Sequence, residues 1–121
     1  MQATGLVLDD VQSSRVTGWI TLGAEHHQPW GLVHGGVYTT AIESAASVGA
    51  SAAAHERGLA AVGVNNNTNF LRSMTVGRVT VDARAVQQGT SQQLWEVRIA
   101  DDCDRLIAIG QVRLQNISPR A

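Results

Sequence analysis

The chain has few of the features that mark secreted, nucleic-acid-binding or membrane proteins. It has one cysteine, Cys103, so no internal disulfide can form, which is typical of proteins of the reducing cytoplasm. Its formal net charge is −1 and its basic residues are scattered, so no partner such as nucleic acid or an anionic membrane is expected. The first ten residues lack the basic start and apolar core of a signal peptide. We therefore expect a cytoplasmic location.

Long hydrophobic runs are also missing, with one partial exception. Residues 37–54 carry a single charge, that of Glu43, and approach the lower length of a membrane-spanning helix. This stretch is rich in alanine, serine and threonine, however, and no lysine or arginine precedes it as an anchor. The composition therefore argues against a membrane span.

The length of 121 residues predicts one domain over residues 1–121, with a frayed tail at about 117–121. A chain of this size has room for one modest core, and oligomerisation would add stability. No repeat or low-complexity tract divides it. Cys103 stands in "DDCDR", which is more typical of a turn than of a thiol site.

The hydrophobic pattern predicts two strands, one helix and then four strands. We expect short strands near residues 6–8 and 15–22, a loop at 23–33 and a helix at 34–56, ended near Gly58. The four later strands are expected in "AVGVNNNTNF", "RVTVDARAVQ", "QLWEVRIA" and "LIAIGQVRLQ". This order indicates an α+β fold with one antiparallel sheet and one dominant helix.

The expected helix is built largely of small residues: Ala41, Ala45, Ala46, Gly49, Ala50, Ala52 and Ala53. Such side chains let a sheet or another helix approach the backbone closely. We therefore expect a curved sheet wrapped around this helix.

One side of the same helix carries polar chemistry. At 100° per residue, the following residues share a stripe: Gly36, Thr39 or Thr40, Glu43, Ser47 and Ala50. The first-turn N–H groups of Gly35 and Gly36 have no intrahelical partner, so they could polarise a carbonyl oxygen as an oxyanion hole. The alternative is that "HGG" forms only a tight turn into the helix. For Glu43, the alternative to catalysis is an ion pair with an arginine of the sheet.

The spacing of these groups has a consequence for assembly. Gly35 and Glu43 lie eight residues apart, about 12 Å along one helix, so one acyl carbon cannot touch both. Two antiparallel copies of the helix would bring the glycine turn of one chain beside the acid of the other. If both groups serve one reaction, the site lies across a dimer interface.

The segment "QPWGLVHGGVYTTAIESAAS", followed by "VGVNNNTNFLRS" and "GTSQQLWEVRI", resembles the hotdog-fold acyl-CoA thioesterases. The branch it resembles contains 4-hydroxybenzoyl-CoA thioesterase, 1,4-dihydroxy-2-naphthoyl-CoA thioesterase and PaaI-like proteins. The resemblance implies a hotdog fold, in which an antiparallel sheet wraps around one long central helix. It covers residues 5–116 and is most specific at residues 28–47.

The resemblance also implies roles for individual residues. Glu43 would act on the thioester as nucleophile or as base for water, and the Gly35 N–H would polarise the thioester carbonyl. Gln28 and His34 would orient thioester or water, and Ser47 would help to hold water or the leaving group. The substrate would contact Gly36, Thr39, Phe70, Arg72, Gly89, Thr90 and Ser91. No metal and no cofactor is implied, and coenzyme A enters only as part of the substrate.

Three of these positions have ordinary alternatives. Gln28 could be a polar loop residue, His34 a hydrogen-bonding group at the helix start, and Arg72 a partner in a common salt bridge. Trp30, Tyr38 and Phe70 could line an aryl pocket, whereas Trp19, Trp30 and Trp95 could instead be core or interface residues.

The chain also departs from the family pattern at two places. Phe70 stands where relatives often have a histidine near the acyl pocket, which weakens the case for a hydroxylated aromatic acyl group. The turn at residues 89–93 has no basic residue for the nucleotide end of coenzyme A.

The sequence therefore predicts a thioester hydrolase acting on an acyl-CoA or acyl-carrier thioester as a homo-oligomer, a dimer of dimers. One alternative is a non-catalytic acyl-CoA-binding hotdog domain. Another is a hotdog dehydratase or hydratase, although no histidine stands at the matching depth of the helix. The acyl group, the thiol carrier, the choice between nucleophile and base, and the faces that form a tetramer stay open.

Overall fold

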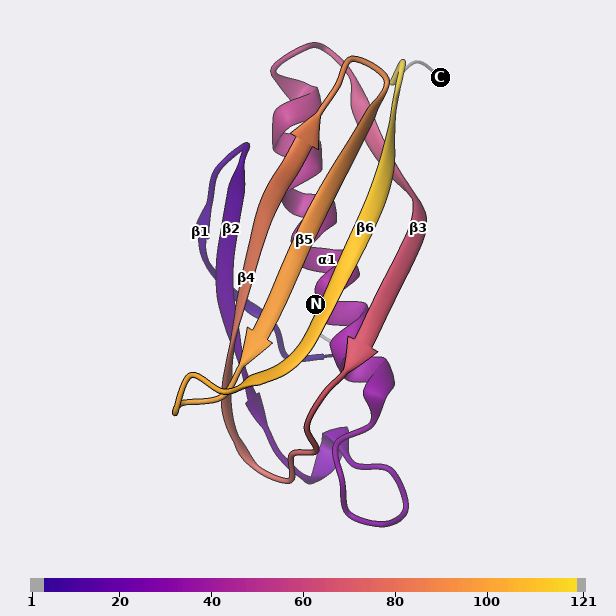
Figure 1. Cartoon of the computed structure of the whole chain (residues 1–121). Helices are drawn as coiled ribbons and strands as arrows, with labels where there is room; N and C mark the ends of the chain where they lie inside the picture. Colours follow the sequence, from indigo (N-terminus) through magenta and orange to yellow (C-terminus); the bar gives the residue numbers. More distant parts are fainter. Residues whose placement is uncertain (1–3, 120–121) are drawn as a thin grey trace.

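The computed structural model describes residues 4–119 and contains one long helix and one sheet (Figure 1). Its elements in chain order are β1 (Val7–Val11), β2 (Arg15–Leu22), η1 (Ala24–His26), α1 (Gly35–His55), β3 (Ala60–Phe70), β4 (Gly77–Gln88), β5 (Gln92–Ala100) and β6 (Leu106–Ile117). The predicted order of elements is confirmed. The expected helix bounds differ from those of α1 by one residue at each end.

The six strands form one sheet in the order β1-β2-β4-β5-β6-β3, and every neighbouring pair is antiparallel. Helix α1 contacts all six strands and runs across one face of the curved sheet (Figure 1). The α+β prediction of a sheet wrapped around one helix is therefore confirmed. Because β3 pairs with β6 and not with β4, it forms one free edge of the sheet.

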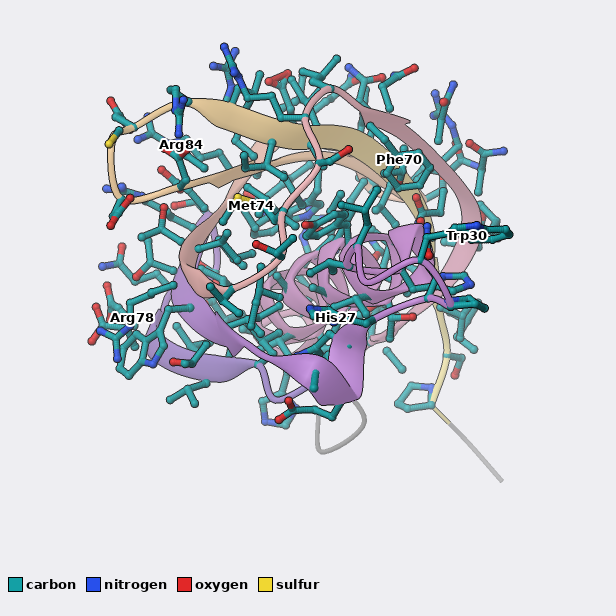
Figure 2. The ribbon with its side chains drawn as sticks, turned by 90° about the horizontal axis from the view of Figure 1, so that it is seen from below. His27, Trp30, Phe70, Met74, Arg78 and Arg84 are labelled. Atoms are coloured by element: carbon teal, nitrogen blue, oxygen red, sulfur yellow. The ribbon has the colours of Figure 1, made fainter. Side chains whose placement is uncertain are left out.

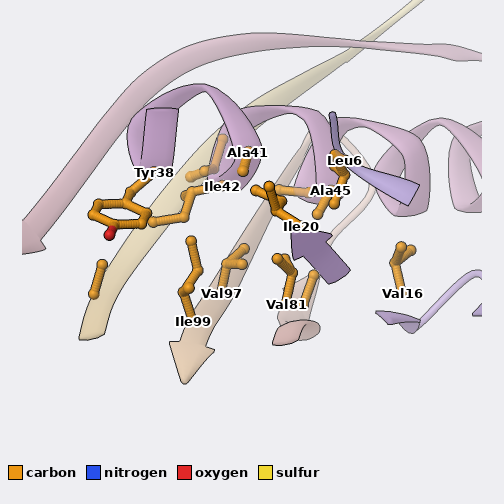
Figure 3. Close-up of a cluster of buried hydrophobic side chains, with 14 of the residues drawn as sticks. Leu6, Val16, Ile20, Tyr38, Ala41, Ile42, Ala45, Val81, Val97 and Ile99 are labelled. Atoms are coloured by element: carbon orange, nitrogen blue, oxygen red, sulfur yellow. The ribbon is translucent and has the colours of Figure 1, made fainter. Parts of the chain in front are cut away.

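Buried and exposed residues alternate along β4, as the pleat of a strand with one buried face requires. Val79, Val81 and Ala83 are buried, whereas Thr80 and Arg84 are exposed. Figure 3 shows Val81, Val97 and Ile99 of the sheet below Ala41, Ile42 and Ala45 of the helix. The core is this single layer between α1 and the sheet.

Both ends of α1 follow from local chemistry. His34 is the N-cap, and its Nδ1 accepts a hydrogen bond from the Gly36 N–H at 3.0 Å. At the other end Gly58 adopts φ +71°, the left-handed conformation that glycine favours after a helix. The expected glycine stop is therefore confirmed.

A packing contact explains why the helix needs small residues. Gly49 is buried against the indole of Trp95, and a Cβ at Gly49 would overlap that ring. Trp95 is fully buried between helix and sheet, so it is a core residue. By contrast, Trp19 is half-buried beneath the Arg78 guanidinium, and Trp30 is 82% exposed.

The remaining expectations concern the termini and the turn near Cys103. Ile117 still pairs with Ala60, so β6 extends one residue into the tail that was expected to fray. The last two residues of that tail lie outside the described range. Cys103 is exposed in the turn between β5 and β6, as expected. Within residues 4–119, no helix is both long and apolar enough to cross a membrane.

Candidate active site

The carboxylate of Glu43 lies half-buried between α1 and the start of β3. Its Oε2 accepts a hydrogen bond from the Ser47 hydroxyl, one helical turn further on, at 3.3 Å. Its Oε1 accepts one from the Asn66 side-chain amide of β3, also at 3.3 Å. The acid is thus held from two directions, and Glu43 and Ser47 lie on one side of the helix, as predicted; the expected role of Ser47 toward water or the leaving group stays a prediction.

The backbone of β3 makes room for this acid. A Cβ at Gly63 would overlap Oε2 of Glu43, so a side chain there would displace the carboxylate. The pairing of β3 with β6 also shifts register between Gly63 and Asn65, as at a β-bulge. Bulges and strand glycines recur where a strand must admit a close neighbour. The strand is therefore locally shaped around the carboxylate.

No cation neutralises Glu43 within residues 4–119. The ion pairs of the described chain involve Asp82, Asp101, Glu25 and Glu96, and none includes Glu43. The alternative of an ion pair with a sheet arginine is therefore absent from the described part of the chain. A carboxylate fixed only by neutral donors keeps lone pairs available for a proton or for attack.

The glycines at the start of α1 differ in their hydrogen bonding. The Gly36 N–H donates to His34 Nδ1, and the Val37 N–H donates to the His34 carbonyl, each at 3.0 Å. The Gly35 N–H has no acceptor among the described residues. Gly35 is therefore the free donor at the positive end of the helix dipole.

A cavity of about 360 Å³ opens beside this donor and collects four predicted residues: Gln28, Gly35, Phe70 and Arg72. The Phe70 ring packs over the helix start, with its Cζ 3.1 Å from where a Cβ on Gly35 would lie. Arg72 makes no ion pair within the described residues, so the salt-bridge alternative is absent there. Gly35 therefore faces an open pocket with an apolar wall and one cation.

Gln28 and His34 both make structural hydrogen bonds. The side-chain carbonyl of Gln28 accepts from the Trp30 N–H, which closes the loop before the helix. His34 caps the helix, as described above. Figure 2 shows Trp30 at the outer edge of the molecule on the same side as Phe70. The expected role of Gln28 and His34 in orienting thioester or water stays a prediction, and both residues also have a structural role.

The hydroxyl of Tyr38 is the one buried side-chain oxygen or nitrogen without a hydrogen-bond partner among residues 4–119. Its ring lines the cavity at Gly35 and lies 6.5 Å from the Phe70 ring, centroid to centroid. Burial raises the pKa of Tyr38 to about 12, so the hydroxyl stays protonated at neutral pH.

The turn Gly89–Ser91, expected to hold the nucleotide end of the thiol carrier, lies at the opposite end of the helix (Figure 1). Its Gly89 carbonyl accepts from Arg57 at 2.9 Å and from Asn116 at 3.3 Å. The turn shares a cavity of about 270 Å³ with Arg113 of β6. The turn itself has no cation, but the neighbouring strand supplies one.

One chain does not bring all the predicted residues together. Thr39 lies between the Gly35 end of the helix and Glu43. Its hydroxyl donates to the Gly35 carbonyl at 3.4 Å, and its own carbonyl accepts from Asn66 at 3.2 Å. Glu43 does not line the cavity at Gly35, because about 12 Å of helix separates the two residues.

Sequence reasoning missed Gly63, Asn66 and Arg113. A signal for the first two was the run of asparagines beside a glycine, residues with low β-propensity inside a predicted strand. Arg113 carried no signal, because only the strand order places it beside the turn.

Comparison with known proteins bears on the family and the fold. The sequence profile of the Thioesterase superfamily matches residues 31–108. The Mycobacterium tuberculosis protein Rv1847 is 53% identical over 92 residues, covering 74% of this chain and 66% of that protein, just under two thirds of its length. Its solved structure superposes with a TM-score of 0.95 at 42% identity, covering 99% of this chain and 97% of that one.

Two further similarities concern proteins named for a thioester activity. The 1,4-dihydroxy-2-naphthoyl-CoA hydrolase of Listeria monocytogenes is 34% identical over 110 residues, covering 91% of this chain and 89% of that protein. The structure of a mutant of thioesterase PA1618 from Pseudomonas aeruginosa has a TM-score of 0.88 at 26% identity, covering 96% of this chain and 84% of that one.

Proposed function

Because this chain belongs to the thioesterase superfamily, we propose that it hydrolyses an acyl thioester to a free acid and a thiol. The observation that supports this most directly is the hydrogen-bonding environment of the Glu43 carboxylate. This acid has no cationic partner in the described chain, and two neutral donors orient it beside a strand glycine that leaves it room. A carboxylate fixed in this way suits proton abstraction or nucleophilic attack.

The proposed reaction uses the free donor at the start of α1. The thioester carbonyl oxygen accepts from the Gly35 N–H, which stabilises the negative charge that develops as the carbonyl carbon becomes tetrahedral. In one route Glu43 takes a proton from water, and the hydroxide attacks that carbon. In the other, Glu43 attacks directly, and water then hydrolyses the acyl anhydride. The C–S bond breaks in both routes. In the first, the thiolate takes its proton from the protonated Glu43 or from solvent; in the second, Glu43 is acylated and carries no proton, so the thiolate takes one from solvent.

We further propose that the site forms between two chains. The free edge strand β3 exposes Val62 and Val64, at 42% and 54% of their surface, and edges of this kind are usually covered. Pairing of β3 with β3 of a second copy would set two α1 helices antiparallel. The Gly35 end of one helix then lies beside Glu43 of the other. A dimer of such dimers is our proposed assembly.

The acyl end and the thiol-carrier end of the substrate would each bind in a different cavity. The cavity at Gly35, with walls of Phe70 and Tyr38, would take the acyl group. The turn Gly89–Ser91 of a neighbouring chain, together with Arg113, would hold the anionic end of the thiol carrier. This division makes an acyl-CoA the first choice of substrate, processed in the cytoplasm and without a metal or further cofactor.

The deciding experiment is a thiol-release assay with aryl-, short-chain and long-chain acyl-CoA, including 1,4-dihydroxy-2-naphthoyl-CoA, which the Listeria relative's name specifies. Wild type should release thiol from at least one substrate. Glu43→Gln, which keeps the size of the side chain but removes its charge, should lower kcat by about a hundredfold or more with the assembly unchanged. Binding without release in wild type would instead indicate an acyl-CoA-binding domain.

Subunit complementation tests the shared site. Glu43→Ala chains mixed with Gly35→Val chains form mixed dimers in which one site collects both lesions and the other site is intact. Random pairing should restore up to about one quarter of wild-type activity. No recovery despite verified subunit exchange would mean that each site lies within one chain.

A further inference from the structure

We propose that Asn66 is a positioning residue for Glu43 and that Thr68 anchors the far end of its amide. This inference rests on the proposed function, in which Glu43 performs the chemistry. Asn66 and Thr68 lie two residues apart on β3 and are both half-buried, whereas the flanking Asn65, Asn67 and Asn69 are exposed. The two side chains therefore share the face of the strand that packs against α1.

The Asn66 amide connects the strand to two points of the helix. Its Nδ2 lies 3.3 Å from Oε1 of Glu43 and 3.2 Å from the carbonyl oxygen of Thr39. An amide nitrogen carries two N–H donors, so one can serve each acceptor. The side chain thus fixes the carboxylate relative to the turn of helix that precedes it.

Thr68 holds the far end of the amide, whereas the Glu43 and Thr39 oxygens decide which end faces the acid. The Thr68 hydroxyl donates to Asn66 Oδ1 at 2.7 Å, an ordinary O–H···O distance, on the side away from Glu43. If the amide turned over, its oxygen would face the carboxylate and the Thr39 carbonyl, and its nitrogen would face the Thr68 oxygen. Two oxygen–oxygen repulsions would replace two hydrogen bonds, so the observed orientation is strongly favoured.

These hydrogen bonds fix the orientation of the Glu43 carboxylate and leave lone pairs on both of its oxygens. Asn66 occupies one lone-pair position on Oε1 and Ser47 occupies one on Oε2. Each carboxylate oxygen has about two such positions, so both keep one for water or substrate. The side chain therefore cannot rotate freely, yet it stays reactive.

The test compares two substitutions of Asn66 in the thiol-release assay, with Asn67→Ala as the matched control on the exposed face of the same strand. Asn66→Ala should lower kcat about tenfold with KM within about twofold, because a misplaced acid slows the chemical step. Asn66→Asp keeps the volume but sets a second carboxylate 3.3 Å from the first, so kcat should fall further than with alanine. Asn67→Ala should behave as wild type.

A purely structural role predicts the opposite order. If Asn66 only fills space, the isosteric Asn66→Asp would be the milder change, and that ranking would overturn the proposal. Unchanged kcat in a properly assembled Asn66→Ala would also overturn it.

Thr68→Val provides an independent measurement should the Asn66 variants assemble poorly. This change keeps the shape of the side chain and removes only the hydroxyl, so we expect kcat to fall about threefold with KM unchanged. Wild-type kcat in Thr68→Val would contradict the assigned role of Thr68. Glu43→Gln, measured in parallel, separates the two hypotheses. If that variant is inactive while every β3 variant is active, only the positioning role fails. If wild type and Glu43→Gln turn over equally, the role of Glu43 fails and the positioning role with it; if wild type releases no thiol from any substrate, the proposed function itself fails.

Discussion

On each of two faces of helix α1, a glycine makes room for a close contact, but one contact belongs to the core and the other to the candidate site. On the face toward the sheet, Gly49 lacks a side chain so that the Trp95 indole can reach the helix backbone. On the face toward the sheet edge, Gly63 of β3 lacks one so that the Glu43 carboxylate can reach the strand. The first contact joins two rigid, fully buried groups. The second admits the flexible end of a half-buried acid.

The two glycines therefore matter for different properties: Gly49 for the stability of the fold and Gly63 for the geometry of the site. Filling the space at Gly49 forces a core ring to move, which changes stability because interiors are densely packed. Filling the space at Gly63 displaces only a carboxylate, which costs the fold little but changes the geometry of the site. Substitutions on the two faces should therefore separate activity from stability.

The largest expected effect is on activity, at Gly63. We expect Gly63→Ala to lower kcat by about a hundredfold, since a displacement of about 1 Å at a reacting group can have that effect. The free energy of unfolding should stay within about 1 kcal/mol of wild type, because alanine is no worse than glycine in a strand. Steady-state kinetics and urea unfolding on the same preparation give both numbers. Full activity in this variant would remove the distinction between the two faces.

The next effect is on stability, at Gly49. Gly49→Ala should lower the free energy of unfolding by about 2 kcal/mol, because overlap with Trp95 outweighs the better helix propensity of alanine. Activity per folded molecule should be retained. Ser51→Ala, at an exposed position of the same helix, is the matched control and should be neutral or slightly stabilising. A Gly49→Ala protein as stable as wild type would show that the core at Trp95 yields easily.

A smaller effect is expected at Tyr38, which belongs to the sheet-facing side yet lines the cavity at Gly35. Tyr38→Phe removes a buried hydroxyl that has no partner within residues 4–119. We expect the free energy of unfolding to rise by about 1 kcal/mol, because an unsatisfied buried group destabilises the folded state. Thermal unfolding without ligand measures this. Lower stability in Tyr38→Phe would mean that the hydroxyl is in fact hydrogen-bonded.

The smallest expected effect is on stability at low pH, and it concerns Asp101 in the turn between β5 and β6, away from both faces of α1. The Arg105 N–H, the Arg105 guanidinium and the Cys103 N–H donate to Asp101 and lower the pKa of its carboxyl, although burial opposes this. A lowered folded-state pKa adds stability above the unfolded value of about 3.9, and this is lost as pH falls through the folded-state pKa.

Asp101→Asn should therefore be less stable than wild type at neutral pH, and the difference should shrink as the pH falls below about 4. Urea unfolding midpoints across this pH range would check the sign. Because Asp101 contacts neither face of α1, kcat at neutral pH should not change. A stability difference that does not depend on pH would contradict the assigned role of the carboxylate.

Much of the fold could be predicted because its signals are local. The period-2 pattern of Val79, Val81 and Ala83 reports burial of one strand face, and Gly58 reports the end of the helix, without knowledge of any distant contact. Gly35 and Glu43 stood out for the same reason: the glycine pair and the lone acid are unusual within their own segment. Their placement on one helix, and their separation along it, follows from helical geometry alone.

The sequence by itself thus determined the order of elements, the small-residue helix and the residues with unusual chemistry. Tertiary structure decided which neighbours those residues have. Asn66 reaches Glu43, and Arg113 reaches the turn Gly89–Ser91, only because β6 lies between β5 and β3 in the sheet. Strand order depends on contacts between residues far apart in the chain, and no local periodicity encodes these pairings. The physical reason is that a side chain's own segment sets its direction, whereas the folding of the whole chain sets what lies opposite.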